Sequence, residues 1–160
     1  MTQKAQAAYE KALSKIEACR RQGKAGTTLN LNGMGLTQVP PEIGQLTALT
    51  QLDLRNNQLS TLPPEIGQLT ALTLLYLLNN QLSTLPPEIG QLKALTGLYL
   101  HGNSGLGLPE GVLGPTLDES HSNNPVAKPQ AILDYYFALK TQGRTDAGGA
   151  AVDGGARARG

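Results

Sequence analysis

Pairs of leucines two residues apart recur along this chain at a constant interval of 23 residues. The four pairs are Leu29 and Leu31, Leu52 and Leu54, Leu75 and Leu77, and Leu98 and Leu100. Residues two apart in an extended segment point to one side, and the residues between them point to the other. The pattern therefore predicts four short strands that stack side by side as a parallel sheet, with leucines on its inner face.

Further aliphatic positions recur with the same period. Residues 58–73 and 81–96 are identical except that Thr70 corresponds to Lys93. The additional inward positions are Leu36, Leu59 and Leu82, then Val39, Leu62, Leu85 and Leu108, then Ile43, Leu46, Leu49, Ile66, Leu69, Leu72, Ile89, Leu92 and Leu95. No single unit could bury these side chains alone, so stability must come from the stacking of neighbouring units in a solenoid.

The segments between the strands carry a second recurring motif, Pro-Pro-Glu-Ile-Gly, at 40–44, 63–67 and 86–90. Proline and an acidic residue favour the first turn of a helix. The glycine that follows favours a short element. We therefore predict a brief helical or 3₁₀ turn in each return segment.

Three asparagines, Asn57, Asn80 and Asn103, fall where the chain turns out of its strand. A buried amide can bridge backbone groups that such a turn leaves unpaired, and the loss of one partner costs about 1–3 kcal/mol. We therefore predict a structural asparagine ladder. The first unit has Met34 at this position, which cannot form these bonds, so its turn is expected to be irregular.

Within residues 46–66, LTALTQLDLRNNQLSTLPPEI, the stretch from Leu49 to Ile66 fits the pattern LxxLxLxxNxLxxLPxxI. This pattern resembles the leucine-rich repeat of the intracellular 23-residue LPxxI type, as in Ras-pathway scaffolds and in the repeat domain of bacterial Roco proteins. The resemblance covers residues 29–113. It implies an α/β fold: a leucine-rich repeat solenoid with a short parallel sheet on the concave face, helical or 3₁₀ returns on the convex face, and helical caps at both ends.

Four segments are predicted. They are an N-terminal capping helix in 1–24, four leucine-rich units in 25–114, a loop and a C-terminal capping or linker helix in 115–142, and a disordered tail in 143–160. In the first helix, Tyr9, Leu13, Ile16 and Cys19 have helical spacing, and Gly23 is the expected stop.

A second helix is expected over 129–141, with Ile132, Tyr135, Tyr136 and Leu139 on one face. Asn124-Pro125 and this helix together resemble the segment that joins the repeats to the GTPase domain in Roco proteins. A phosphate-binding loop should then follow. The glycines of 146–160 lack the required order, so this stretch, which lacks apolar periodicity, is expected to be disordered.

Composition narrows the function classes further. The 160 residues fit one domain, and a net charge of +1 argues against nucleic acid or an anionic membrane as a partner. Cys19 is the only cysteine, and the N-terminus is too polar for a signal peptide, so we expect a cytoplasmic protein. His101 and His121 lie in unrelated contexts, and the glutamates Glu42, Glu65 and Glu88 should lie on a solvated convex face. The sequence therefore predicts no cofactor, no metal and no enzymatic activity.

The residues that should point away from the core form three columns across the strands. These are Thr28, Gln51, Leu74 and Gly97, then Asn30, Asp53, Tyr76 and Tyr99, then Asn32, Arg55, Leu78 and His101. Apart from Tyr76 and Tyr99, they differ in every unit, whereas the remainder of each repeat is nearly invariant. We expect an exposed patch of tyrosines and aliphatic residues with a polar rim, which is typical of a protein-binding hot spot.

The predicted partner-binding residues are therefore Asp53, Arg55, Leu74, Tyr76, Leu78, Tyr99 and His101. The leading hypothesis is a non-enzymatic interaction module that binds a protein or peptide partner on its concave face. One alternative is a regulatory fragment of a Roco-type GTPase whose catalytic domain is not in this chain. Another alternative is weak self-association through a poorly capped end.

Overall fold

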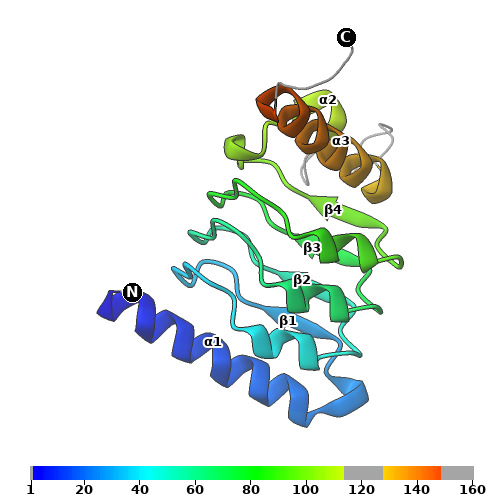
Figure 1. Cartoon of the computed structure of the whole chain (residues 1–160). Helices are drawn as coiled ribbons and strands as arrows, with labels where there is room; N and C mark the ends of the chain where they lie inside the picture. Colours follow the sequence, from blue (N-terminus) through cyan, green and yellow to red (C-terminus); the bar gives the residue numbers. More distant parts are fainter. Residues whose placement is uncertain (1, 114–127, 149–160) are drawn as a thin grey trace.

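The computed structural model describes residues 2–113 and 128–148, with the backbone alone from 142 to 148. The chain forms a stack of similar units between two helical ends (Figure 1). The helices and strands are α1 (Gln3–Arg21), β1 (Thr28–Asn30), β2 (Gln51–Asp53), β3 (Leu74–Tyr76), β4 (Gly97–Tyr99), α2 (Glu110–Leu113) and α3 (Pro129–Gly148). None of the helices in the described part of the chain is long and apolar enough to cross a membrane.

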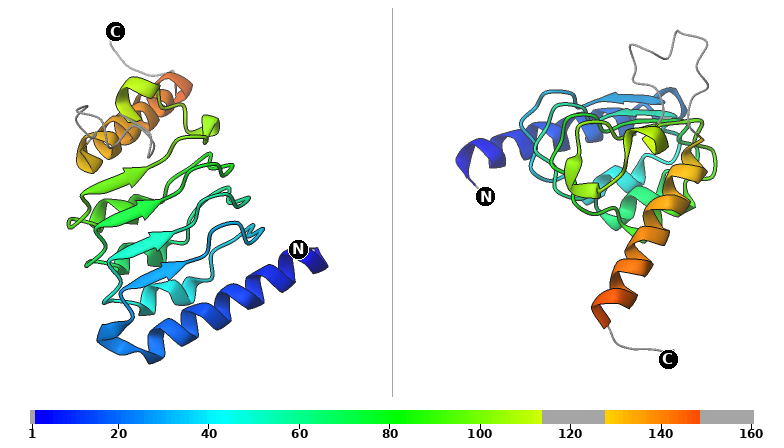
Figure 2. Two further views of the ribbon diagram at one scale, coloured as in Figure 1. Left: turned by 180° about the vertical axis from the view of Figure 1, so that it is seen from behind. Right: turned by 90° about the horizontal axis from the view of Figure 1, so that it is seen from above.

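The four strands form one parallel sheet in the order β1-β2-β3-β4. Each strand is shifted by one 23-residue unit, so Leu29, Leu52, Leu75 and Leu98 are in register. Seen along the stack, the strands line one side and the return segments line the other (Figure 2). This arrangement confirms the predicted α/β leucine-rich repeat solenoid.

Short 3₁₀ turns fill the return segments, at Pro41–Gln45, Pro64–Gln68 and Pro87–Gln91. The second proline of each Pro-Pro pair begins the turn, since its fixed φ suits a first helical position. The glycines of the first two turns, Gly44 and Gly67, permit close stacking on the next turn. A Cβ atom at Gly67 would lie 2.7 Å from the carbonyl oxygen of Glu88, whereas one at Gly90 would meet nothing within 4 Å.

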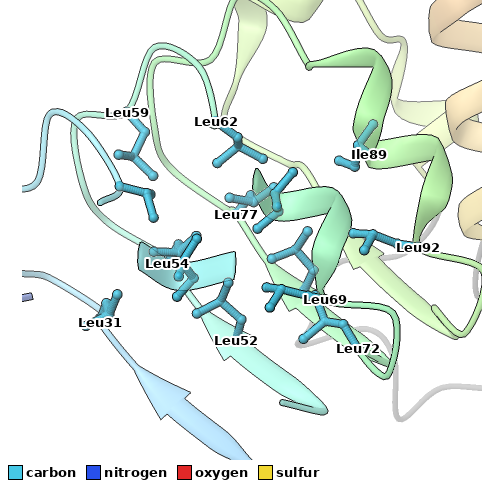
Figure 3. Close-up of a cluster of buried hydrophobic side chains, with 14 of the residues drawn as sticks. Leu31, Leu52, Leu54, Leu59, Leu62, Leu69, Leu72, Leu77, Ile89 and Leu92 are labelled. Atoms are coloured by element: carbon cyan, nitrogen blue, oxygen red, sulfur yellow. The ribbon is translucent and has the colours of Figure 1, made fainter. Parts of the chain in front are cut away.

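The core lies between the sheet and the 3₁₀ turns, and Figure 3 shows the leucines of successive units converging there. Leu52, Leu54, Leu75 and Leu77 are completely buried, as is Ile66 from the return side. Burying one such side chain contributes about 1.5–3 kcal/mol. Because every unit shares this core with its neighbours, the stack is held together by contacts between successive units.

The turn after each strand contains a residue in the left-handed backbone region. Gly33, Asn56, Asn79 and Gly102 occupy equivalent positions, with φ between 58° and 79°. Glycine and asparagine tolerate this region better than other residues do. The first unit has a further positive φ, 73° at Gly35, so its turn is irregular, as predicted.

The helix α1 covers one end of the stack with a face that only partly matches the predicted one, since Ile16 and Cys19 are buried as expected. Its buried residues are Ala5, Ala8, Ala12, Ile16 and Cys19. Tyr9 and Leu13, which the spacing placed on the packed face, are only half-buried. Small alanine side chains allow the helix to approach the repeats closely, and hydrophobic pattern alone does not reveal this.

The helix α3 is longer than predicted, because it continues through Gly148. Residues 143–148 are therefore helical, not part of a disordered tail. A single interior glycine such as Gly143 costs a helix only about 1 kcal/mol. The predicted loop residues 115–127 and the remaining tail, 149–160, lie outside the described residues.

The packed face of α3 also differs from the prediction. Ile132, Leu133 and Tyr136 are buried, whereas Tyr135 is 40% exposed. The backbone amide of Leu85 donates a hydrogen bond to Tyr136 Oη at 2.9 Å. This contact, between residues far apart in the sequence, attaches α3 to the last repeats, where Figure 1 shows it beyond β4.

Candidate functional site

The sheet brings together the columns that the sequence predicted to point outward. The register pairs Asp53 with Tyr76 and Tyr76 with Tyr99, and it places Leu74 beside Gly97. Side chains at these positions lie on the concave face, opposite the leucine core. The candidate site is therefore one continuous surface built from four strands.

Tyr76 and Tyr99 stack on one another, with ring centroids 5.3 Å apart and planes inclined by 12°. A Cβ atom at Gly97 would lie 2.8 Å from Leu74 Cδ2 and 3.0 Å from Tyr99 Cε2, so these two side chains close over the glycine. The pKa of Tyr76 is raised, first by burial and then by neighbouring Tyr99. The Tyr76 phenol therefore remains protonated to a higher pH than an ordinary tyrosine does.

The predicted exposed patch needs a correction. Tyr99 is only 9% exposed, and Leu74, Tyr76, Leu78 and His101 are half-buried. The reason is local: β4 carries a glycine where the other strands carry a side chain, and the neighbouring side chains move into that space. The apolar half of the site is thus a partly closed, packed surface.

Beside this aromatic stack, Arg55 and Asp53 form a bidentate ion pair. Arg55 Nε donates to Asp53 Oδ1 at 3.0 Å, and Nη2 donates to Oδ2 at 2.7 Å. This hydrogen bonding raises the pKa of Arg55. The Arg55 guanidinium carbon also lies 5.4 Å from the centre of the Tyr76 ring, within the range of a cation–π contact. We call Asp53, Arg55, Tyr76 and Tyr99 the concave row.

The buried asparagines lie directly behind this surface. Asn57 Oδ1 accepts hydrogen bonds from the amides of Met34 and Leu36, both at 3.0 Å. Its Nδ2 donates to the carbonyls of Leu31, Leu54 and Arg55 at 2.9 to 3.1 Å.

Asn80 and Asn103 form equivalent bonds one and two units further along. Because these amides hold the ends of the strands, they also fix the backbone that carries Arg55 and Leu78.

A second, outer series of asparagines was missed by the sequence reasoning. Asn56 Nδ2 donates to Asn32 Oδ1, and Asn79 Nδ2 donates to Asn56 Oδ1, both at 3.0 Å. The signal was present, since the doublets Asn56-Asn57 and Asn79-Asn80 recur with the repeat period. The first asparagine of each doublet supports the rim of the concave face, and the second supports its interior.

Outside the concave face, we looked among the described residues for a metal site and for a reactive side chain. They contain no group of three or more His, Cys, Asp or Glu residues that could hold a metal ion. The Cys19 thiol is buried and donates to the Gly26 carbonyl at 3.3 Å, and burial raises its pKa. A thiol in this state is a poor nucleophile. The concave face therefore remains the candidate functional site.

Comparison with known proteins agrees with the repeat architecture. Residues 28–105 match the model of a family described as leucine-rich repeat region. This part of the chain is therefore similar to leucine-rich repeat regions. The match includes all four strands and ends within the turn after β4, and leucine-rich repeat domains in general act as protein–protein interaction modules. No curated protein matches this chain.

Two similar solved structures are also leucine-rich repeat proteins. One is a leucine-rich repeat protein of Leptospira interrogans, at 52% identity over 48% of this chain and 20% of that chain, with a TM-score of 0.48. The other is the leucine-rich repeat domain of the type III effector XopL, at 24% identity over 49% of this chain and 36% of that chain, with a TM-score of 0.38. This chain matches about a fifth and about a third of their lengths. The LPxxI subtype and the Roco resemblance stay predictions.

Proposed function

We propose that this leucine-rich repeat chain is a non-enzymatic interaction module that binds a protein or peptide segment on its concave face. The observation that carries the proposal is the concave row, in which Arg55 is held by Asp53 against a stacked pair of tyrosines. Tyrosine and arginine are enriched among the residues that dominate binding energy. Their mutual contacts fix the side chains in advance, which reduces the entropy lost on binding.

The pattern of variation supports the same proposal. Residues 58–73 and 81–96 are almost identical, yet the outward residues of the strands next to them differ, from Asp53 and Arg55 to Tyr76 and Leu78. Packing within the stack does not require this difference, because the strands have the same backbone register. A surface that meets another molecule would account for it.

The size of the face restricts the type of partner. Four strands about 4.8 Å apart make a surface about 20 Å wide. This surface is smaller than the ~800 Å² that each partner contributes to a standard interface. A short peptide segment or a transient partner fits these dimensions better than a large folded surface.

The proposal can be tested with a library of random peptides displayed on phage and selected on the purified chain. Selected peptides are then measured by fluorescence anisotropy against the wild type and two variants. Tyr76→Ala removes the half-buried ring from the concave row, so we expect binding to weaken about tenfold or more. Tyr135→Ala removes an exposed tyrosine from α3 and should leave binding unchanged.

Thermal denaturation of both variants must show that the fold is intact. Tyr99 is not a suitable test position, because its burial would confound loss of binding with loss of stability. Peptides whose affinity is the same for wild type and for Tyr76→Ala would contradict the proposed site.

A further inference from the structure

We infer that the partner of the concave face is an acidic peptide segment, bound in one orientation with a carboxylate over β1 and β2 and an apolar side chain over β3. This inference rests on the proposed function and adds the chemistry of the ligand. It follows from which hydrogen-bonding groups on the face are already used within the chain, and from how polar and apolar residues divide between the strands.

Polarity falls between β2 and β3. The outward positions of β1 and β2 and of the residues just after them are Thr28, Asn30, Asn32, Gln51, Asp53 and Arg55, and all are polar. The corresponding positions are Leu74, Tyr76 and Leu78 for β3, and Gly97, Tyr99 and His101 for β4. A ligand that crosses the strands must therefore present polar groups at one end and apolar groups at the other.

The side-chain oxygens of three residues in the polar half are already occupied. The carboxylate of Asp53 accepts three hydrogen bonds from Arg55, from its backbone amide at 3.1 Å and from Nε and Nη2. Asn30 Oδ1 accepts from the backbone amide of Asn32 at 2.9 Å, and Asn32 Oδ1 accepts from Asn56 Nδ2 at 3.0 Å. These oxygens are therefore less available to an incoming donor.

Three donors in the same half are not occupied. Within residues 2–113 and 128–148, Asn30 Nδ2, Asn32 Nδ2 and Arg55 Nη1 donate no hydrogen bond. The Arg55 side chain is 34% exposed, whereas that of Asp53 is 14% exposed, so the cation faces solvent more than its partner does. Lys15 Nζ, which donates to the carbonyl of Asn30 at 3.1 Å, adds a positive charge at the edge of β1.

The polar half thus combines free donors with two positive charges and one negative charge, and its complement is a carboxylate. Hydrogen bonds from charged donors to a carboxylate are among the strongest in proteins. The Arg55 guanidinium lies 5.4 Å from the Tyr76 ring, so the polar and apolar halves meet within one side-chain length. In an extended peptide, residues two apart point to the same side about 7 Å from one another. The expected motif is an Asp or Glu two residues from an aromatic or aliphatic residue.

The test uses the strongest peptide from the selection described above and the same peptide with its acidic residue changed to the corresponding amide. With the wild-type chain, we expect the amide peptide to bind about tenfold more weakly, and we expect added salt to weaken the acidic peptide more. Peptides enriched in Lys or Arg, or an acidic and an amide peptide of equal affinity, would overturn the inference.

Two variants of the chain make the test specific. Asn32→Asp keeps an acceptor for Asn56 but replaces the free donor with a negative charge, so the acidic peptide should bind about tenfold more weakly. Arg55→Gln leaves Asp53 without its cation, so the preference for the acidic peptide over the amide peptide should disappear. Lys93→Thr removes one positive charge from the return side and restores the residue found in the preceding repeat. It should retain the wild-type preference.

The outcomes separate this inference from the proposed function. Peptides that depend on Tyr76 but show no preference for a carboxylate would leave the interaction module standing and overturn the acidic ligand. Peptides that are insensitive to Tyr76→Ala, Asn32→Asp and Arg55→Gln would overturn both.

Discussion

The inner and outer faces of the same strands differ in how strongly packing restricts the type of residue at each position. Leu52 and Leu75 point inward from β2 and β3, and both are completely buried. Asp53 and Tyr76 point outward from those strands and share no chemistry, although they are paired in register. The comparison teaches that packing restricts the interior positions of each unit to aliphatic residues. The backbone of the stack places no such restriction on the residue types of its outer surface.

The asparagine doublets that follow β2 and β3 show the same contrast between adjacent residues. The Asn80 side chain is buried and bonds backbone groups of two units, whereas the Asn79 side chain is exposed and donates to a neighbouring side chain. The first prediction tests this contrast, and the next two test the strands and the returns. They are ordered from the largest expected effect to the smallest.

Asn80→Ala should lower the free energy of unfolding by about 3–5 kcal/mol, because it leaves buried backbone groups unpaired, among them the Leu59 amide. Asn79→Gly should change it by less than about 1 kcal/mol, because glycine accepts the φ of 58° and only an exposed hydrogen bond is lost. Urea denaturation followed by circular dichroism measures both values. Equal losses would show that the inner asparagine has no special role.

Leu75→Ala should cost about 2–4 kcal/mol, because it creates a cavity at a completely buried position. Leu74→Ala, one residue earlier on the same strand, should cost about 1 kcal/mol, because its side chain is half-buried on the concave face. The same denaturation experiment provides the comparison. A larger effect at Leu74 would mean that the outer face contributes as much to folding as the core.

Gly67→Ala should destabilise the chain by about 1–2 kcal/mol, because the new Cβ would lie 2.7 Å from the Glu88 carbonyl oxygen. Gly90→Ala, at the equivalent position of the next unit, should instead stabilise by about 0.5 kcal/mol, because no atom lies within 4 Å of the new methyl group and the unfolded chain loses freedom. Midpoints of thermal denaturation that shift in opposite directions would bear out the contrast. A shift of the same sign for both would contradict it.

The site was only partly predictable. The repeat period placed Asp53, Arg55, Tyr76 and Tyr99 on one surface, since residues of a parallel stack meet their counterparts one unit away. It did not reveal that Gly97 allows Leu74 and Tyr99 to close over it, nor that the oxygens of Asp53 are used by Arg55. Such details depend on side-chain rotamers and on neighbours in space, which alternation of leucines does not encode.

What the sequence determined by itself is the stack: the strands and their register, the 3₁₀ returns and the positions of the buried asparagines. Each of these arises from contacts between residues 23 apart, and the same contacts recur along the chain, so one unit predicts the next. Only the tertiary structure decided the ends, where α1 packs through alanines and α3 buries Tyr136 while exposing Tyr135. Those helices each pack once, against surfaces with no counterpart elsewhere in the chain, and their sequences carry no repeated pattern from which the contact could be inferred.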